Sequence, residues 1–139
     1  MILNTDEFSK FANSLADDAS KTSMHYFRNK IEIEIKDDES PVTLADKETE
    51  QVLREKIRKE YPHHGILGEE YENEKIDAEF LWVLDPIDGT RSYIAGHKDF
   101  GNLIEFRLMY STFSKSFEYF GSPCIAIACE ILVFACAFN

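Results

Sequence analysis

An uninterrupted apolar run ends abruptly in a turn that carries two carboxylates. Residues 80–84 (FLWVL) have no charged member, and DPIDGT follows directly at residues 85–90. A short apolar run that stops at turn residues is typical of a strand buried on both faces. Proline fixes φ and glycine permits a tight turn, so the acids at positions 85 and 88 can converge. We therefore expect a buried strand that delivers carboxylates to a turn.

Two stretches have the apolar spacing of amphipathic helices. Asn4 followed by Glu7 has the form of a capping box, and the apolar positions after it recur at helical spacing: Phe8, Phe11, Ala12, Leu15, Ala16 and Ala19. The second helix is expected from Thr43 to about Glu60, with Pro62 behind it and this apolar stripe: Val52, Leu53, Ile57 and Tyr61. An α+β chain follows from these helices and the neighbouring strand patterns.

Three further segments have strand patterns. Residues 31–35 (IEIEI) alternate strictly, which predicts a strand with one buried and one wet face, closed by Lys36. Residues 65–68 (GILG) form a short apolar run between glycines, and Glu69 and Glu70 lie at its end. Residues 102–110 have a mixed pattern that allows one more strand.

Composition excludes several classes of function. The 139 residues suffice for one domain, and 26 acidic against 15 basic residues leave no basic stripe for nucleic acid. Cys124, Cys129 and Cys136 fit neither a disulfide framework nor a zinc site, and we expect small buried hydrophobes. The first residues lack the pattern of a signal peptide, which predicts a cytoplasmic location. Residues 123–138, interrupted by Glu130, are shorter than the roughly 20 residues of a membrane span, so no membrane partner is expected.

The acidic turn has the chemistry of a Mg²⁺ site beside a phosphate site. Mg²⁺ prefers oxygen ligands, and Asp85, Asp88 and the carbonyl of Ile87 form a partial shell to which Glu69 can add an oxygen. Residues 89–94 allow a short helix, and the free amide groups of a helix start attract phosphate. This combination suits phosphoryl transfer to water. The plain alternative is a surface turn, because Asp, Pro and Gly are common turn residues.

Three ordered segments carry a family resemblance. Residues 42–46 (VTLAD), 68–70 (GEE) and 82–90 (WVLDPIDGT) resemble the inositol monophosphatase family in order and spacing. Residues 91–96 (RSYIAG) and 100–104 (FGNLI) look most like its histidinol-phosphatase branch. The resemblance implies a layered αβαβα sugar-phosphatase fold and Mg²⁺-dependent hydrolysis of a small phosphate monoester. Histidinol phosphate is the first expected substrate, an inositol monophosphate the second and a nucleotide 3′-phosphate the third.

The resemblance also assigns roles to individual residues. It implies that Glu69, Asp85, Ile87 and Asp88 bind Mg²⁺. It implies further that Asp46 and Thr90 position the attacking water as a general-base pair. The residues expected to contact the substrate are Lys36, Glu69, Ile87, Asp88, Gly89 and Thr90.

Several other polar residues have two interpretations. Lys36 lies near a family lysine that faces the site, and an ordinary strand-end lysine is the alternative. Glu70 is either an acid behind the metal ligands or an exposed neighbour of Glu69. His63 and His64 fit solvated loop histidines better than metal ligands, and residues 97–98 fit a plain polar loop better than a substrate contact.

The resemblance covers residues 1–104 and then stops. Family members are about twice as long, and a Trp-Asp motif in their second half completes the metal site. We expect residues 1–104 to form the metal- and phosphate-binding part, and residues 105–139 a divergent tail. A second hypothesis follows: the chain is a catalytically inactive remnant that binds metal weakly or acts as an interaction module. The family commonly forms dimers, so a homodimer is compatible with either hypothesis.

Overall fold

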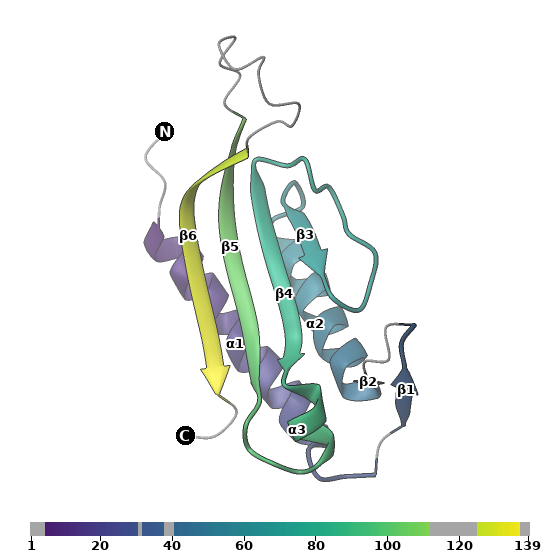
Figure 1. Cartoon of the computed structure of the whole chain (residues 1–139). Coiled ribbons are helices and arrows are strands. Elements are labelled where there is room, and N and C mark those ends of the chain that lie inside the picture. Colours follow the sequence, from purple (N-terminus) through teal and green to yellow (C-terminus); the bar gives the residue numbers. More distant parts are fainter. Residues whose placement is uncertain (1–4, 31, 38–40, 112–124, 137–139) are drawn as a thin grey trace.

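The described residues form a four-stranded mixed sheet, a two-stranded antiparallel sheet and two long helices that lie beside the larger sheet. The computed structural model describes residues 5–30, 32–37, 41–111 and 125–136, with the side chains of 110–111, 125–131 and 134–136 left aside. The elements in order are α1 (Thr5–Tyr26), β1 (Ile33–Ile35), β2 (Pro41–Thr43), α2 (Leu44–Glu60), β3 (Gly65–Gly68), β4 (Phe80–Asp88), α3 (Thr90–Ile94), β5 (Gly101–Ser111) and β6 (Ile125–Cys136) (Figure 1).

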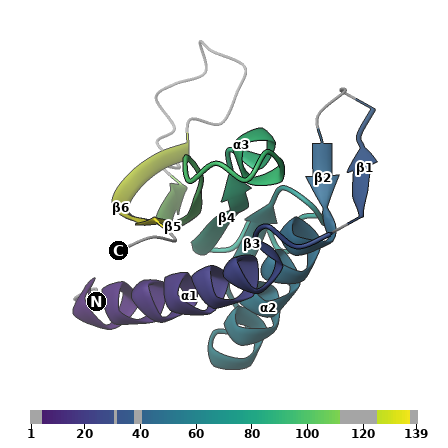
Figure 2. The ribbon, with the colours of Figure 1, turned by 90° about the horizontal axis from the view of Figure 1, so that it is seen from below.

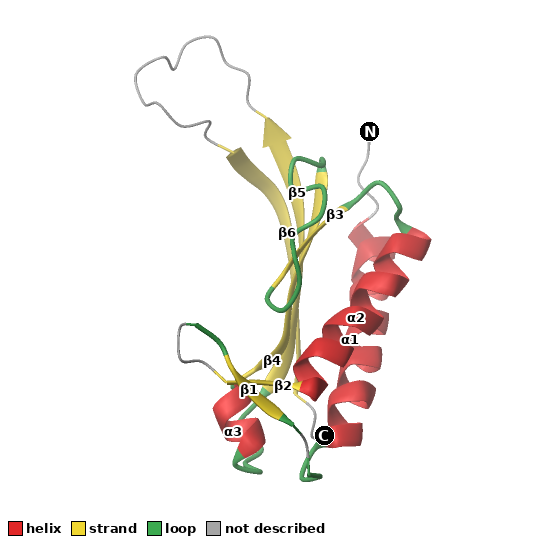
Figure 3. Ribbon diagram, turned by 90° about the vertical axis from the view of Figure 1, so that its right-hand side faces the viewer, coloured by secondary structure: helices red, strands yellow, loops and turns green. Residues whose placement is uncertain are grey.

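Helices α1 and α2 cover the same face of the sheet (Figure 3). The core between these layers joins Leu15 of α1 and Leu53 of α2 to Trp82 of β4 and Phe106 of β5. Phe8 stacks on Phe106 with ring centroids 4.3 Å apart. The apolar spacing of α1 is confirmed, because its buried positions are Phe8, Ala12, Leu15, Ala16, Ala19 and Ser23. The expected cap residue Asn4 lies outside the described residues.

Helix α2 begins at a capping box made by Thr43 and Asp46. The Thr43 hydroxyl accepts from the Asp46 amide, and the Asp46 carboxylate accepts from the Thr43 amide. Of the predicted stripe, Leu53 and Ile57 are fully buried, Val52 is half-buried and Tyr61 caps the end of the helix. The buried face also contains polar and charged residues that the apolar pattern could not predict: Asp46, Thr49, Glu50 and Arg54.

The larger sheet has the strand order β3-β4-β5-β6. Strand β3 runs parallel to β4, and the Cα partners include Gly65 with Leu81 and Gly68 with Leu84. Strand β5 runs antiparallel to β4 and to β6. The predicted strands at 65–68, 80–84 and 102–110 are all present, and β4 continues through the acidic turn to Asp88. The carboxyl ends of β3 and β4 therefore meet at one edge.

The prediction for residues 31–35 is partly wrong. Strand β1 pairs only with β2, in a small separate sheet beside α3 (Figure 2). Ile33 and Ile35 are 48% and 68% exposed, so the strand has no buried face. The alternating pattern indicated the extended backbone correctly, but only β2 packs against α2 and α3, and both faces of β1 are exposed. Ile31 lies outside the described residues.

The expected boundary after residue 104 falls inside β5. Residues 105–111 continue this strand, and β6 pairs with it from Ile125 to Cys136. Cys124 and the side chains of Cys129 and Cys136 lie outside what is described, so their burial stays a prediction. In the described part of the chain, no helix combines the length and apolar character that a membrane crossing needs. The cytoplasmic location and the homodimer stay predictions.

Candidate active site

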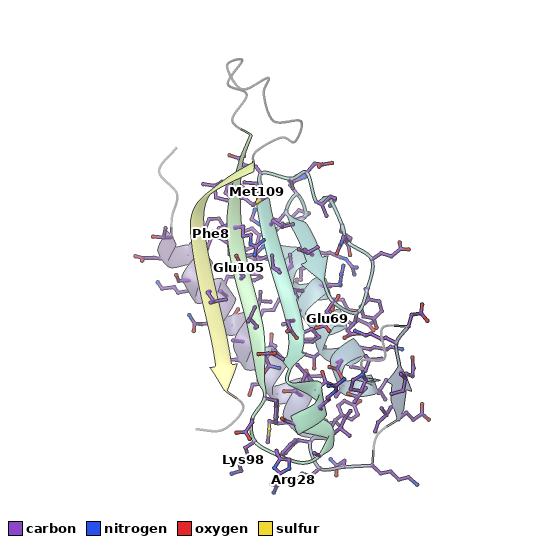
Figure 4. The ribbon with its side chains drawn as sticks, in the orientation of Figure 1. Phe8, Arg28, Glu69, Lys98, Glu105 and Met109 are labelled. Carbon is purple, nitrogen blue, oxygen red and sulfur yellow. The ribbon has the colours of Figure 1, made fainter. Side chains whose placement is uncertain are left out.

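The parallel pairing of β3 with β4 brings two acids together. Gly68 is the partner of Leu84, so Glu69 and Asp85 follow on neighbouring strands at the same edge of the sheet. Figure 4 shows Glu69 beside the carboxyl-terminal part of β4. Burial raises the pKa of Asp85 to about 7, and the hydrogen-bonded and charged neighbour Glu69, with Asp88 and Asp46, adds to this effect. One oxygen of Asp85, Oδ1, is buried without a hydrogen-bond partner.

Side-chain contacts with neighbouring elements fix the turn after Asp85. The pairing of β4 with β5 is irregular between Asp85 and Asp88, where the chain bulges. The side chain of Ile87 is buried in a cluster of its own with Ala45 and three aromatic residues, Phe27, Tyr93 and Phe100. The Asn102 amide donates to the carbonyl of Pro86. The side chain of Ile87 thus anchors the turn, and Asp88 is left exposed to solvent.

Gly89 makes the turn from β4 into α3 possible. Its φ is +87°, and a Cβ at this position would lie 2.8 Å from the carbonyl oxygen of Asp99. Both facts exclude an ordinary side chain. Thr90 therefore begins α3 directly behind the acids, and the first amides of such a helix have no intrahelical acceptors.

Asp46 and Thr90 meet although 44 residues separate them. The Thr90 hydroxyl lies 3.2 Å from Asp46 Oδ1 and 3.0 Å from the Ile87 carbonyl oxygen. A hydroxyl has a single hydrogen, so it donates to one of these acceptors at a time. Burial raises the pKa of Asp46, whereas hydrogen bonds from Thr43 and Thr90 oppose this shift. A carboxylate so placed can take a proton through the threonine hydroxyl.

Lys36 faces the two acids that follow β3. Its Nζ lies 2.8 Å from Glu70 Oε1 and 3.4 Å from Glu69 Oε1. Burial lowers the pKa of Lys36, but the hydrogen bond and charge of Glu70, together with Glu69, outweigh it and the pKa is raised. Glu70 is not an exposed neighbour, because only 3% of its side chain is accessible. Lys36 therefore pairs with both acids that follow β3, and its contact with a substrate stays a prediction.

The oxygen atoms at the turn can be compared with the ligands that Mg²⁺ prefers. Across the described ranges, no three His, Cys, Asp or Glu side chains are arranged to hold a metal ion together. The oxygens available at the turn are nevertheless of the kind that Mg²⁺ prefers, namely the carboxylates of Glu69, Asp85 and Asp88 and one carbonyl. The unpartnered Oδ1 of Asp85, crowded by other acids, also fits a cation. The chemistry of these residues therefore suits the ion.

The remaining sequence candidates are His63, His64, His97 and Lys98. His63 is exposed, as are His97 and Lys98. His64 does not fit the expected solvated loop: it stacks on Tyr61 with centroids 4.5 Å apart and accepts a hydrogen bond from Trp82 Nε1 at 3.1 Å. The His64 ring therefore packs within an aromatic cluster that includes Tyr61 and Trp82.

Sequence reasoning missed Glu50 and Arg54, which lie beneath the acids that follow β3. Glu50 is completely buried and Arg54 is 2% exposed, and Arg54 Nε lies 2.8 Å from Glu50 Oε1. A signal was present in the sequence. Both residues occupy the helical face of Leu53 and Ile57, so an opposite-charge pair four residues apart on an apolar face marked a buried polar contact.

Comparison with known proteins identifies the family and several relatives of this chain. The model of the inositol monophosphatase family matches residues 4–128. The chain is 45% identical over 101 residues to the chloroplastic bifunctional phosphatase IMPL2 of Arabidopsis thaliana, covering 71% of this chain and 29% of that protein. It is 38% identical over 96 residues to the histidinol-phosphatase of Chlorobaculum parvum, covering 68% and 37%.

Solved structures share the fold. An inositol monophosphatase from Zymomonas mobilis is 42% identical with a TM-score of 0.62, over 76% of this chain and 40% of that one. An IMPase/NADP phosphatase complexed with Mg²⁺ and phosphate has a TM-score of 0.64 at 24% identity, over 74% and 40%, which is a likeness of fold alone. The chain thus spans about a third of the length of the relatives in sequence. With a family model that matches most of its residues, the chain belongs to the inositol monophosphatase family.

Proposed function

We propose that this chain supplies the metal- and phosphate-binding half of a Mg²⁺-dependent phosphatase of small phosphate monoesters. The observation that supports the proposal most is the convergence at one sheet edge. There Glu69, which follows β3, lies beside Asp85 of β4, and the Asp46–Thr90 pair lies beside the same turn. The named relatives are phosphatases, which agrees with this chemistry.

In the proposed site, Glu69, Asp85, Asp88 and the Ile87 carbonyl hold Mg²⁺. When bound, the ion neutralises phosphate oxygens and activates water. The amides at Gly89 and Thr90 face the phosphate, where the partial positive charge of a helix start favours an anion. Lys36 adds a positive charge at the rim, shared with Glu69 and Glu70.

Asp46 and Thr90 act as the general-base pair in this proposal. The water that attacks phosphorus donates its hydrogen bond to the Thr90 hydroxyl, and the hydroxyl hydrogen points to Asp46 Oδ1. Asp46 is held in place by Thr43, which donates to its other oxygen through both the amide and the hydroxyl. The raised pKa of Asp46 makes it a better proton acceptor than an exposed aspartate.

Histidinol phosphate is the first substrate to test, and an inositol monophosphate is the second. Both are small phosphate monoesters, and the relatives include a histidinol-phosphatase and an inositol-1-monophosphatase. The alternative is a catalytically inactive chain that binds metal weakly or serves as an interaction module. Within the described residues no group of three or more acids, histidines or cysteines is positioned to hold a metal ion, so Mg²⁺ binding must itself be measured.

Turnover and metal binding must be measured separately to distinguish these functions. Phosphate release from histidinol phosphate and inositol 1-phosphate is assayed with and without Mg²⁺, for the wild type and Asp88→Asn. Turnover that needs Mg²⁺ and is lost in the variant supports the phosphatase. Mg²⁺ binding by calorimetry without turnover supports the inactive alternative. If the wild type neither binds Mg²⁺ nor releases phosphate, the proposal is wrong.

A further inference from the structure

A buried carboxylate from α2 holds the backbone of the segment that carries Glu69. Glu50 Oε2 accepts from the amides of Glu69 at 3.0 Å and Glu70 at 2.7 Å, and Oε1 accepts from the amide of Tyr71 at 3.2 Å. Three successive amides therefore point at one side chain. Such a run of N–H groups forms a concave site for an anion, and the protein fills it with its own carboxylate.

Arg54 completes this arrangement from the next turn of α2. Its Nε donates to Glu50 Oε1 at 2.8 Å, and its Nη2 donates to the Tyr71 carbonyl at 3.1 Å. Its Nη1 also reaches Glu74 at 2.7 Å. Backbone donors and acceptors of residues 69–71 are thus bound by one ion pair inside the fold.

Gly68 leaves the space that the carboxylate needs. A Cβ at Gly68 would lie 2.0 Å from Glu50 Oε1 and 2.5 Å from Arg54 Nη2. The last residue of β3 is therefore a glycine because a buried ion pair approaches its backbone.

The energetics of such a pair argue for a specific role. A buried ion pair contributes little to stability, because removing both charges from water offsets their attraction. Apolar residues at positions 50 and 54 would continue the face formed by Leu53 and Ile57 at no such cost. The side chain of Glu69 is itself 47% exposed, so its location depends on the backbone beneath it.

We infer that Glu50, supported by Arg54, is a positioning residue that fixes the backbone of residues 69–71 so that Glu69 is presented beside Asp85. This inference rests on the proposed function, in which Glu69 and Asp85 bind Mg²⁺. Glu50 does not touch the ion or the substrate. It acts on the metal site only through the three amides.

The test compares Glu50→Gln with two variants of the same helix. Glu55→Gln removes one negative charge from an exposed position, and Leu53→Ala destabilises the core from a buried position. Amide NMR spectra of the full chain are recorded during titration with Mg²⁺ alone, well below the melting temperature of each variant. Hydrogen exchange of the amides of residues 69–71 is measured on the same samples without metal.

We expect Glu50→Gln to weaken Mg²⁺ binding by about tenfold or more, the range seen when groups behind metal ligands are changed. The three amides should exchange faster in this variant relative to the other amides of β3 and β4. Glu55→Gln should match the wild type. Leu53→Ala should bind Mg²⁺ within about twofold of the wild type, because it remains folded and keeps the Glu50 contacts.

Wild-type Mg²⁺ affinity in Glu50→Gln, or an equal loss in Leu53→Ala, overturns the positioning role while leaving the metal site intact. A wild-type chain that shows no response to Mg²⁺ overturns the proposed function instead. In that case unchanged exchange of the three amides in Glu50→Gln also overturns the positioning role, and selectively faster exchange supports it.

Discussion

Protonation of His64 should destabilise the folded chain in mildly acidic solution. His64 accepts a hydrogen bond at Nδ1 from Trp82 Nε1, and its ring stacks on Tyr61 with an angle of 8° between the planes. An imidazolium has hydrogens on both nitrogens, so it cannot accept from the indole. Burial lowers the pKa of His64 to about 4, and the charge of His63 contributes in the same direction.

The direction of the pH dependence of stability follows from the number of protons that the folded and unfolded chains bind. Because the pKa is lower in the folded chain than the usual 6.5, unfolding takes up a proton between pH 6.5 and 4. The stabilising contribution of neutral His64 is fully present above pH 6.5 and is lost as the pH falls toward 4. The full shift corresponds to roughly 3 kcal/mol, at about 1.4 kcal/mol per tenfold change. Since the ring is only half-buried, solvent screening reduces the expected loss to about 1–2 kcal/mol.

Urea unfolding at pH 7.5 and pH 4.5 measures this loss, with His64→Gln as the control. Glutamine offers an oxygen acceptor to Trp82 but does not titrate. The carboxylates titrate alike in both proteins, so the difference between their pH slopes isolates His64. The wild type should lose about 1–2 kcal/mol more than the variant over this range. Equal pH slopes, or an NMR titration of the His64 ring near pH 6.5, would refute the reasoning.

Three other perturbations have expected outcomes. Gly89→Ala should lower stability by about 1–3 kcal/mol in urea unfolding, because φ is +87° and the added Cβ meets a backbone oxygen. Gly96→Ala, also at positive φ, should lose less, because its added Cβ would make only ordinary van der Waals contacts with the Arg28 side chain, and equal losses would count against the steric argument. Asn102→Leu should cost about 1–3 kcal/mol, since the carbonyl of Pro86 loses its donor, and an unchanged melting temperature would contradict this. In EDTA at pH 8, Asp85→Asn should melt higher than the wild type, because a crowded buried carboxylate is removed, and its melting temperature should no longer rise with Mg²⁺. A lower melting temperature for Asp85→Asn than for the wild type in EDTA would contradict the inference that neighbouring acids destabilise the Asp85 carboxylate.

Local patterns predicted the elements well where one physical cause dominated. The spacing of apolar residues identified α1, and Pro62 marked the end of α2, since both features act within a few residues of backbone. The alternation at residues 31–35 predicted the strand but not its exposure. Exposure depends on whether another element packs there, and the hairpin of β1 and β2 stands apart from the larger sheet.

The acids of the candidate site were visible in the sequence because strand, proline and glycine signals surround them. The partners of the residues that support them were not. The spacing of Glu50 and Arg54 indicated at most a buried polar contact, and their backbone partners were decided only when α2 packed against the end of β3. Asn102 gave no signal, because its partner is a backbone carbonyl on the neighbouring strand.

The sequence by itself determined the buried strand that ends in two carboxylates, the helix starts and the family to which the chain belongs. The strand and the helix starts follow from the dihedral preferences and spacing of neighbouring residues, and the family follows from the resemblance of three ordered motifs. Only the tertiary structure decided that β3 lies parallel to β4, which places Glu69 beside Asp85, and that Asp46 reaches Thr90. Contacts between distant segments depend on how whole elements pack, and the buried carboxylate of Glu50 acquires its three amide partners only through that packing.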